Sequence, residues 1–175
     1  VPYYTADQLA ATTNLPSAMS QVLRNGYINQ QNISMSGGND KTTYFISGNY
    51  FDQKGTVIAT GMKRYNGLVR IDEKISSKLK AGVNLIGSNS NTQNAVYGGT
   101  FENSGVIPAA QNWPANQPLV NPDCSYPINN QYAAAPNPLS YQLNNDHTIA
   151  TRLLSAANLE YEIIKDLKAS AIFSY

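Results

Sequence analysis

The chain has 175 residues, of which only 13% are charged, and its formal net charge is +1. This balance gives no electrostatic basis for binding nucleic acid. A transmembrane helix is excluded because no run of about 18 apolar residues occurs. The single cysteine, Cys124, excludes an internal disulfide and a multi-cysteine metal site.

Residues 1–29 predict a loop with short helical turns. Thr5 to Gln8 has the Thr-x-x-Gln form of a capping box, which favours a helix start. A second short helix is predicted from Ser17 to Arg24, ended by Asn25 and Gly26. We expect this segment to precede a series of strands.

Six segments alternate between apolar and polar residues and predict antiparallel strands. Short turns follow residues 36, 75 and 163, whereas longer connections follow residues 51 and 88. The turn at Gly37 to Asp40 has residues that suit a tight hairpin. We therefore divide the chain into a loop (1–29), four strands (30–92), a long loop (93–147) and two strands (148–175). The strands are expected at 27–36, 42–51, 64–74, 79–88, 148–163 and from 167 onward.

Two architectures fit this alternation, a soluble β-sandwich and a wide transmembrane β-barrel. The strand at 148–163 exceeds the usual globular length of about 5–6 residues. Small residues such as Gly48 and Ala157 lie on the apolar faces, so these faces carry too little side-chain volume for a densely packed core. Tyrosines such as Tyr44 and Tyr50 lie toward strand ends, as in an interfacial girdle. These features favour an all-β, up-and-down meander of about six strands from a large transmembrane barrel.

Four stretches resemble barrel hairpins of the SusC/RagA family of TonB-dependent outer-membrane transporters. The most specific pieces are the SGG-x-DKT-x-Y turn and the group Asp52, Gln53 and Gly55. The resemblance covers most of the chain but not residues 93–147. The stretches are NISMSGGNDKTTYFISGNYFDQKG, KRYNGLVRID, LKAGVNL and RLLSAANLEYEIIKDLKA.

The resemblance implies an internal fragment of a barrel that imports a bulky nutrient, an oligosaccharide or a peptide. It also implies the outer membrane of a Gram-negative cell as the location, with lipid around the barrel. The implied partners are a SusD-like surface lipoprotein and the TonB energy-coupling complex, acting through parts absent from these residues. A surface-exposed all-β binding or adhesin module without transport is the alternative.

The long loop, residues 93–147, contains the candidate contacts for substrate. It holds seven of the nine prolines and the only tryptophan. Aromatic rings pack on C–H surfaces of sugars and peptides, and amide side chains match hydroxyl or amide groups. A loop that packs its own aromatic residues is the alternative interpretation. The candidates are Trp113, Tyr97, Tyr126, Tyr132, Asn112 and Asn116.

Catalytic and metal-binding patterns are not found. His147 is the only histidine, and Asp146 beside it would point to the opposite face of a strand. No nucleophile-elbow, zinc-protease, P-loop or EF-hand spacing occurs. We therefore predict a protein that is not an enzyme and that has no cofactor and no metal site; a barrel enzyme built on His147 is the remaining rival.

Overall fold

The computed structural model describes residues 5–7, 10, 15–95, 105–132, 135–144 and 146–175. It comprises two compact units. The sheet unit contains residues 28–53, 62–92 and 148–175, and the loop unit contains residues 1–27, 54–61 and 93–147. The two units differ in where they bury apolar side chains and in how they satisfy backbone hydrogen bonds.

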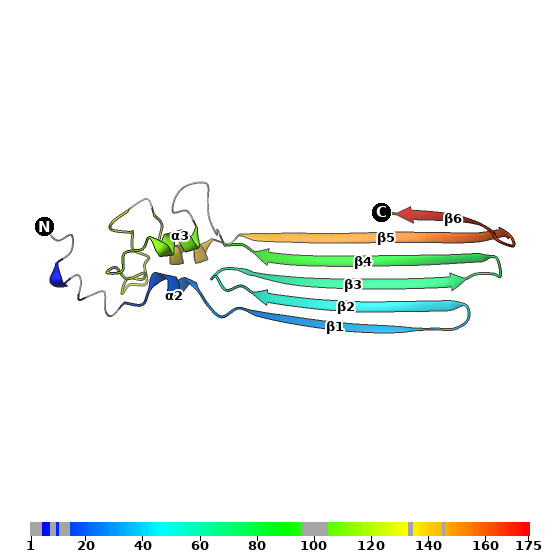
Figure 1. Cartoon of the computed structure of the whole chain (residues 1–175), viewed down its shortest axis with the longest axis horizontal. Helices are drawn as coiled ribbons and strands as arrows, with labels where there is room; N and C mark the ends of the chain where they lie inside the picture. Colours follow the sequence, from blue (N-terminus) through cyan, green and yellow to red (C-terminus); the bar gives the residue numbers. More distant parts are fainter. Residues whose placement is uncertain (1–4, 8–9, 11–14, 96–104, 133–134, 145) are drawn as a thin grey trace. The chain divides into compact units, whose positions relative to one another are not determined.

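Six strands form one sheet in which each strand neighbours the next in the sequence (Figure 1). The spatial order β1-β2-β3-β4-β5-β6 is an up-and-down antiparallel meander, as predicted from the alternating segments. The strands are β1 (Tyr27–Gly38), β2 (Thr42–Lys54), β3 (Gly61–Lys74), β4 (Leu79–Gln93), β5 (His147–Ile164) and β6 (Leu167–Ser174).

Several strands are longer than the sequence predicted, at the ends away from the short turns. β4 continues to Gln93 rather than ending near Ser88, and β3 begins at Gly61 rather than Arg64. Apolar alternation fades in these polar ends, but strand pairing is made by the backbone and does not require it. The Asn89 Nδ2 donates to Thr151 Oγ1 at 2.8 Å, which adds a side-chain bond between β4 and β5 there.

Side chains support two of the three short turns at one end of the strands, and backbone conformation marks the third. Asn39 Oδ1 accepts the N–H groups of Lys41 and Thr42 at 2.8 and 2.9 Å, an Asx-type turn. Ser76 Oγ accepts the Leu79 N–H at 3.1 Å in the second turn. In the third turn Asp166 has a φ of 68°, a left-handed conformation that Asp tolerates better than most residues. The chain leaves the sheet at the opposite strand ends, between β2 and β3 and between β4 and β5.

The register between β5 and β6 separates a polar from an apolar face. Leu159 pairs with Ala171 and Ala157 with Phe173 on one face, which we call the apolar face. Glu160 pairs with Ser170 on the other, the polar face. Because side chains alternate along a strand, these pairs place Leu159 and Phe173 on one side of the sheet and Glu160 on the other.

Contacts across β1, β2 and β3 follow the same division. Asn49 Nδ2 donates to Asn32 Oδ1, and Asn66 Nδ2 donates to Asn49 Oδ1 at 2.9 Å, forming an amide ladder on the polar face. On the apolar face the rings of Tyr50 and Tyr65 are 5.2 Å apart between centroids. These cross-strand pairs fix the register, since a slip by one residue would exchange the faces.

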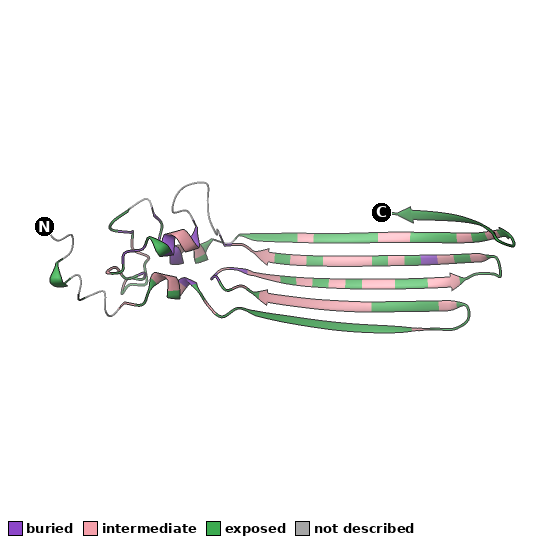
Figure 2. Cartoon of the chain, viewed as in Figure 1, coloured by how far each residue is buried: buried purple, intermediate pink, exposed green. Residues whose placement is uncertain are grey.

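Apolar side chains of the sheet unit remain exposed (Figure 2). On the apolar face Ile33 is 77% exposed, Leu153 66% and Phe173 65%. Within the described residues, none of the buried core cluster lies on a strand of the sheet unit. No described helix is long and apolar enough to span a membrane.

The loop unit, in contrast, has a hydrophobic core. Its helical elements are α2 (Ala18–Val22), α3 (Val106–Gln111) and the 3-10 helix η1 (Pro138–Leu143). Val22 and Val106 have no exposed surface. They pack with side chains from distant parts of the sequence, namely Val57, Ile58, Ala95, Ala110, Trp113, Leu119 and Leu139. This unit therefore has the buried layer that the sheet unit lacks.

Two short helices are predicted near the N-terminus. α2 lies within the predicted segment from Ser17 to Arg24, with Ser17 at its N-cap position. At the other, the capping box from Thr5 to Gln8, residues 5–7 and 10 are described, and Ala6, Asp7 and Ala10 are helical. α2 ends at Val22, earlier than predicted, because Leu23 adopts an extended conformation and forms a bridge with Val57.

The register between β5 and β6 predicts which pair of introduced cysteines can form a disulfide. Ser155 and Tyr175 exchange two backbone hydrogen bonds of 2.9 Å, so Asn158 and Ile172, three residues on, form a non-hydrogen-bonded pair with Cα atoms about 4.5 Å apart. We expect Asn158→Cys with Ile172→Cys to oxidise readily in a Cys124→Ser background. Asn158→Cys with Ala171→Cys, on opposite faces, should stay reduced. Non-reducing mass spectrometry distinguishes them, and equal oxidation would show that the register is wrong.

Candidate functional site

Buried asparagines hold the loop unit together where regular structure is scarce. Asn137 is 5% exposed and donates to the carbonyl of Leu119 at 2.8 Å, while its Oδ1 accepts the Leu139 N–H at 2.9 Å. Asn129 is 1% exposed and donates to the Asn112 carbonyl at 3.1 Å. Each buried amide thus satisfies backbone groups that no helix or strand supplies with partners.

Arg24 joins the segment after α2 to residues 54–61. Its Nη2 donates to the Thr60 carbonyl at 2.8 Å and its Nε to the Gly55 carbonyl at 3.0 Å. The Arg24 N–H donates to the Thr56 carbonyl at 2.8 Å, and the Ile58 N–H donates to the Val22 carbonyl at 3.0 Å. This clamp brings Val57 and Ile58 against Val22 in the core.

Trp113, the main candidate for substrate contact, follows α3 and lies in the core of the loop unit. It is 7% exposed, and its indole Nε1–H donates to the Gln117 carbonyl at 3.0 Å. Pro114 beside it is buried as well. The ring therefore has a structural role, and its only N–H already has a partner.

The other candidates are placed differently from one another. Asn112 donates to the Pro108 carbonyl at 3.0 Å, as part of the exit from α3. Asn116 is half-buried, and its Oδ1 is a buried atom with no hydrogen-bond partner among the described residues. Tyr126 packs against the core, whereas Tyr132 is exposed. Tyr97 lies outside the described residues.

A pocket of about 460 Å³ lies beside Trp113, and we call it the loop pocket. Residues 15–19 form one part of its lining. The other part runs from the end of α3 through Trp113 to Gln117 and includes Ala110, Gln111, Pro114 and Ala115. The loop pocket thus brings together the region predicted to contact substrate and a segment about 100 residues earlier in the sequence.

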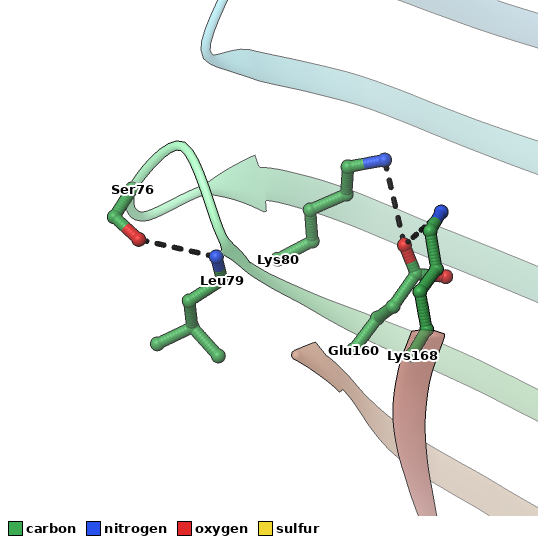
Figure 3. Close-up of polar contacts among 5 residues, drawn as sticks. All are labelled: Ser76, Leu79, Lys80, Glu160 and Lys168. Carbon is green, nitrogen blue, oxygen red and sulfur yellow. Dashed lines mark hydrogen bonds and ion pairs between the residues drawn. The ribbon is translucent and has the colours of Figure 1, made fainter. Parts of the chain in front are cut away.

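A charged cluster lies on the polar face of the sheet unit near the short turns (Figure 3). Glu160 Oε1 is 3.0 Å from Lys168 Nζ and 3.5 Å from Lys80 Nζ, so one carboxylate bridges β4, β5 and β6. Arg70 and Asp72 form a further ion pair at 3.1 Å. Side chains this exposed stabilise a fold only weakly, but here they place charges of both signs across four strands, β3 to β6.

Chemistry of the catalytic or metal-binding kind finds little support. Among the described residues, no group of three or more His, Cys, Asp or Glu side chains could hold a metal ion. His147 begins β5, and Cys124 is exposed on the loop unit with a φ of 65°. Hydrogen bonds from the Ser125 hydroxyl and backbone N–H lower the pKa of the Asp123 carboxyl, as expected of a carboxylate that closes a turn.

Curated relatives match most of the chain. TonB-dependent receptor P3 of Formosa agariphila is 29% identical over an alignment of 168 residues, and the match covers 89% of this chain and 16% of that protein. TonB-dependent receptor P26 of the same organism is 29% identical over an alignment of 133 residues, and the match covers 74% of this chain and 12% of that protein. No family model matches. The chain thus spans about one sixth of the length of the first relative.

The chain is similar to the TonB-dependent receptors. The solved structure of the RagAB peptide transporter aligns with 92% of this chain and 19% of that chain, at a TM-score of 0.74 and 23% identity. The RagAB peptide importer in its open-open state aligns with a TM-score of 0.73. The resemblance predicted from the sequence is confirmed, and the six-stranded antiparallel sheet matches a barrel fragment of a RagA-like protein.

Sequence reasoning did not find Asn129, Asn137 or Arg24, which hold this receptor-like chain's loop unit together. A buried asparagine leaves no periodic signal, because its value comes from the backbone groups that happen to surround it. One available signal was Asn137 before Pro138, since Asn is a preferred cap and Pro is favoured in the first helical turn.

Trp113→Ala should unfold the loop unit and spare the sheet unit. Loss of a buried Trp side chain costs about 3–5 kcal/mol, whereas an exposed substitution usually changes stability by less than about 0.5 kcal/mol. We expect faster hydrogen exchange at the Ala109 N–H, which bonds to the Gly105 carbonyl in α3. Tyr132→Ala, at an exposed ring, is the matched control. Unchanged exchange in Trp113→Ala would contradict the core assignment.

Proposed function

We propose that this chain forms part of the barrel wall and an outer loop of a TonB-dependent active transporter. The transporter resides in the outer membrane of a Gram-negative cell and imports a bulky nutrient, without catalysing a reaction. The observation that carries the proposal is the single-layer sheet, whose apolar face is exposed and whose polar face holds the amide ladder and the charged cluster. In a transmembrane barrel the apolar face would contact lipid and the polar face would contact water in the lumen.

The strand lengths support this proposal. The long strands of the sheet have 12 to 18 residues, compared with about 9–11 for the membrane-crossing part of a tilted barrel strand. Tyr50 and Tyr65 lie together near the loop ends of β2 and β3, where interfacial aromatic residues of a barrel belong. The similarity to receptors and to the RagAB transporter points in the same direction.

The nutrient is an oligosaccharide or a peptide, and the loop unit contributes to its recognition. The likeness to a structure named as a peptide transporter favours a peptide. A SusD-like surface lipoprotein and the TonB complex would be the partners, together with lipid around the barrel. Trp113, Tyr97, Tyr126, Tyr132, Asn112 and Asn116 remain the proposed substrate-contacting set, with Trp113 forming part of the lining of the loop pocket.

The rival, an adhesin-like module without transport, needs its apolar face covered by protein. Covering that face would bury Ile33, Leu153 and Phe173 against a second sheet. The described part of the chain supplies no such layer. Stable extraction of the protein from membranes by salt or urea, without detergent, would favour the rival.

Val83→Arg should impair assembly far more than Asn84→Arg. Gly82 lies beside Asp72 and Asn158 on the polar face. Val83 is the next residue of β4, and because successive side chains of a strand point to opposite faces, it points to the apolar face. Arginine on the lipid side near the bilayer midplane costs about 2–4 kcal/mol, whereas lumen positions tolerate it. The measurement is the fraction of heat-modifiable, folded protein in outer membranes. Equal fractions for the two variants would overturn the facing.

Cysteine labelling should separate the two ends of the sheet. We expect native Cys124, exposed on the loop unit, to react with an impermeant maleimide on intact cells. Asp40→Cys in a Cys124→Ser background lies in a short turn and should react only after the cells are opened. Short turns are periplasmic in outer-membrane barrels, and long loops are extracellular. Labelling of Asp40→Cys on intact cells would reverse the proposed orientation.

A further inference from the structure

We propose that the loop pocket binds one uncharged, apolar side chain of an extended peptide, an inference that rests on the proposed function. The pocket has a volume of about 460 Å³, within the range of about 300–1,000 Å³ usual for ligand sites. Its lining comes from two segments of the same unit that are far apart in the sequence. A leucine- or phenylalanine-type side chain would enter between residues 15–19 and the Trp113 region.

Charge is absent from the lining. Among the described residues that form the loop pocket, none carries an ionisable side chain. Leu15, Met19, Pro114 and the edge of Trp113 supply apolar surface, and methionine adapts its shape to different occupants. A charged ligand group would lose its hydration here without gaining a counter-ion, so a neutral occupant is selected.

Several polar groups of the lining are bonded to partners within the loop unit. The Trp113 N–H is bonded to the Gln117 carbonyl. The Gln117 amide donates to the Ile128 carbonyl and accepts the Asn130 N–H at 2.9 Å. The Ser17 carbonyl accepts the Ser20 hydroxyl at 2.7 Å.

These hydrogen bonds favour a peptide side chain over a sugar ring as the ligand of the loop pocket. A sugar carries hydroxyl groups around its ring, and each would have to exchange water for a protein partner. With the Trp113 and Gln117 groups engaged, the polar side-chain groups that remain in the lining are the Ser17 hydroxyl and the Gln111 amide, fewer than the hydroxyl groups around a sugar ring. An apolar side chain needs no partners and gains from leaving water, while the peptide backbone stays hydrated at the rim near Gln111.

The test uses the full chain folded in detergent micelles and follows emission from Trp113, its only tryptophan. We expect saturable changes with the peptide Gly-Gly-Leu-Gly-Gly and at least about tenfold weaker binding of Gly-Gly-Asp-Gly-Gly. Maltotetraose should give no response. A response to maltotetraose with none to the leucine peptide would replace the proposed ligand class with a sugar, and no saturable response to any probe would overturn the site.

Two variants localise the binding. Ala115 is an exposed residue of the lining, and the larger side chain of Ala115→Leu would fill part of the loop pocket. This variant should weaken binding of the leucine peptide by about tenfold or more. Val120→Leu, an exposed enlargement outside the lining, is the matched control. Gln111→Glu keeps the side-chain shape and should shift preference toward Gly-Gly-Lys-Gly-Gly. Equal binding in Ala115→Leu and Val120→Leu, or no shift in Gln111→Glu, would contradict the proposal.

This inference and the proposed function can fail separately. Membrane assembly with normal peptide uptake, but no effect of Ala115→Leu on binding, would overturn the loop pocket alone. Leucine-peptide binding in a chain that leaves membranes without detergent would instead overturn the transporter and keep the pocket.

Discussion

The need to pair backbone polar groups governs both units, and each unit meets it in a different way. In the sheet unit the strand ladder supplies the partners, so side chains on both faces are free to suit their surroundings. In the loop unit regular structure is short, and side chains supply the partners instead. Asn129, Asn137 and Arg24 together contact the carbonyls of Asn112, Leu119, Gly55 and Thr60. Without those bonds the core around Val22 and Trp113 could not form, because its backbone would be buried unpaired.

The sheet unit has a second constraint, which is its single layer. An ordinary globular sheet covers its apolar face with helices or another sheet. Here Ile33 and Phe173 remain open to the surroundings. A surface of this kind is stable only when something apolar covers it. The polar face is equally specific, since the amide ladder through Asn49 uses groups that would be costly to bury without partners.

The sheet could be predicted from the sequence, whereas in the loop unit only short helices such as α2 were predicted and the core was not. Alternation is a local signal with a period of two, and in Tyr44 to Tyr50 or Leu153 to Tyr161 it is read directly from neighbouring residues. The strand ends were missed because pairing continues through polar residues such as Asn89, where only the backbone decides. The loop core depends on residues about 90 apart, such as Val22 and Trp113, and no local pattern records which of them meet. Trp113 stood out as a large aromatic residue, but its burial depends on Val106 and Leu119, which the sequence alone does not place.

The same hydrogen bonds that make the loop unit a folded body also limit what it can recognise. A flexible loop rich in asparagine and glutamine would keep its amides available for a polar ligand. Here Asn129, Asn137 and Gln117 are engaged internally, and of these three Gln117 alone lines the loop pocket. The loop pocket is preformed, so the entropy cost of ordering its side chains is incurred when the chain folds and not when a ligand binds. Recognition by such a surface discriminates by size and charge more than by the pattern of hydroxyl groups.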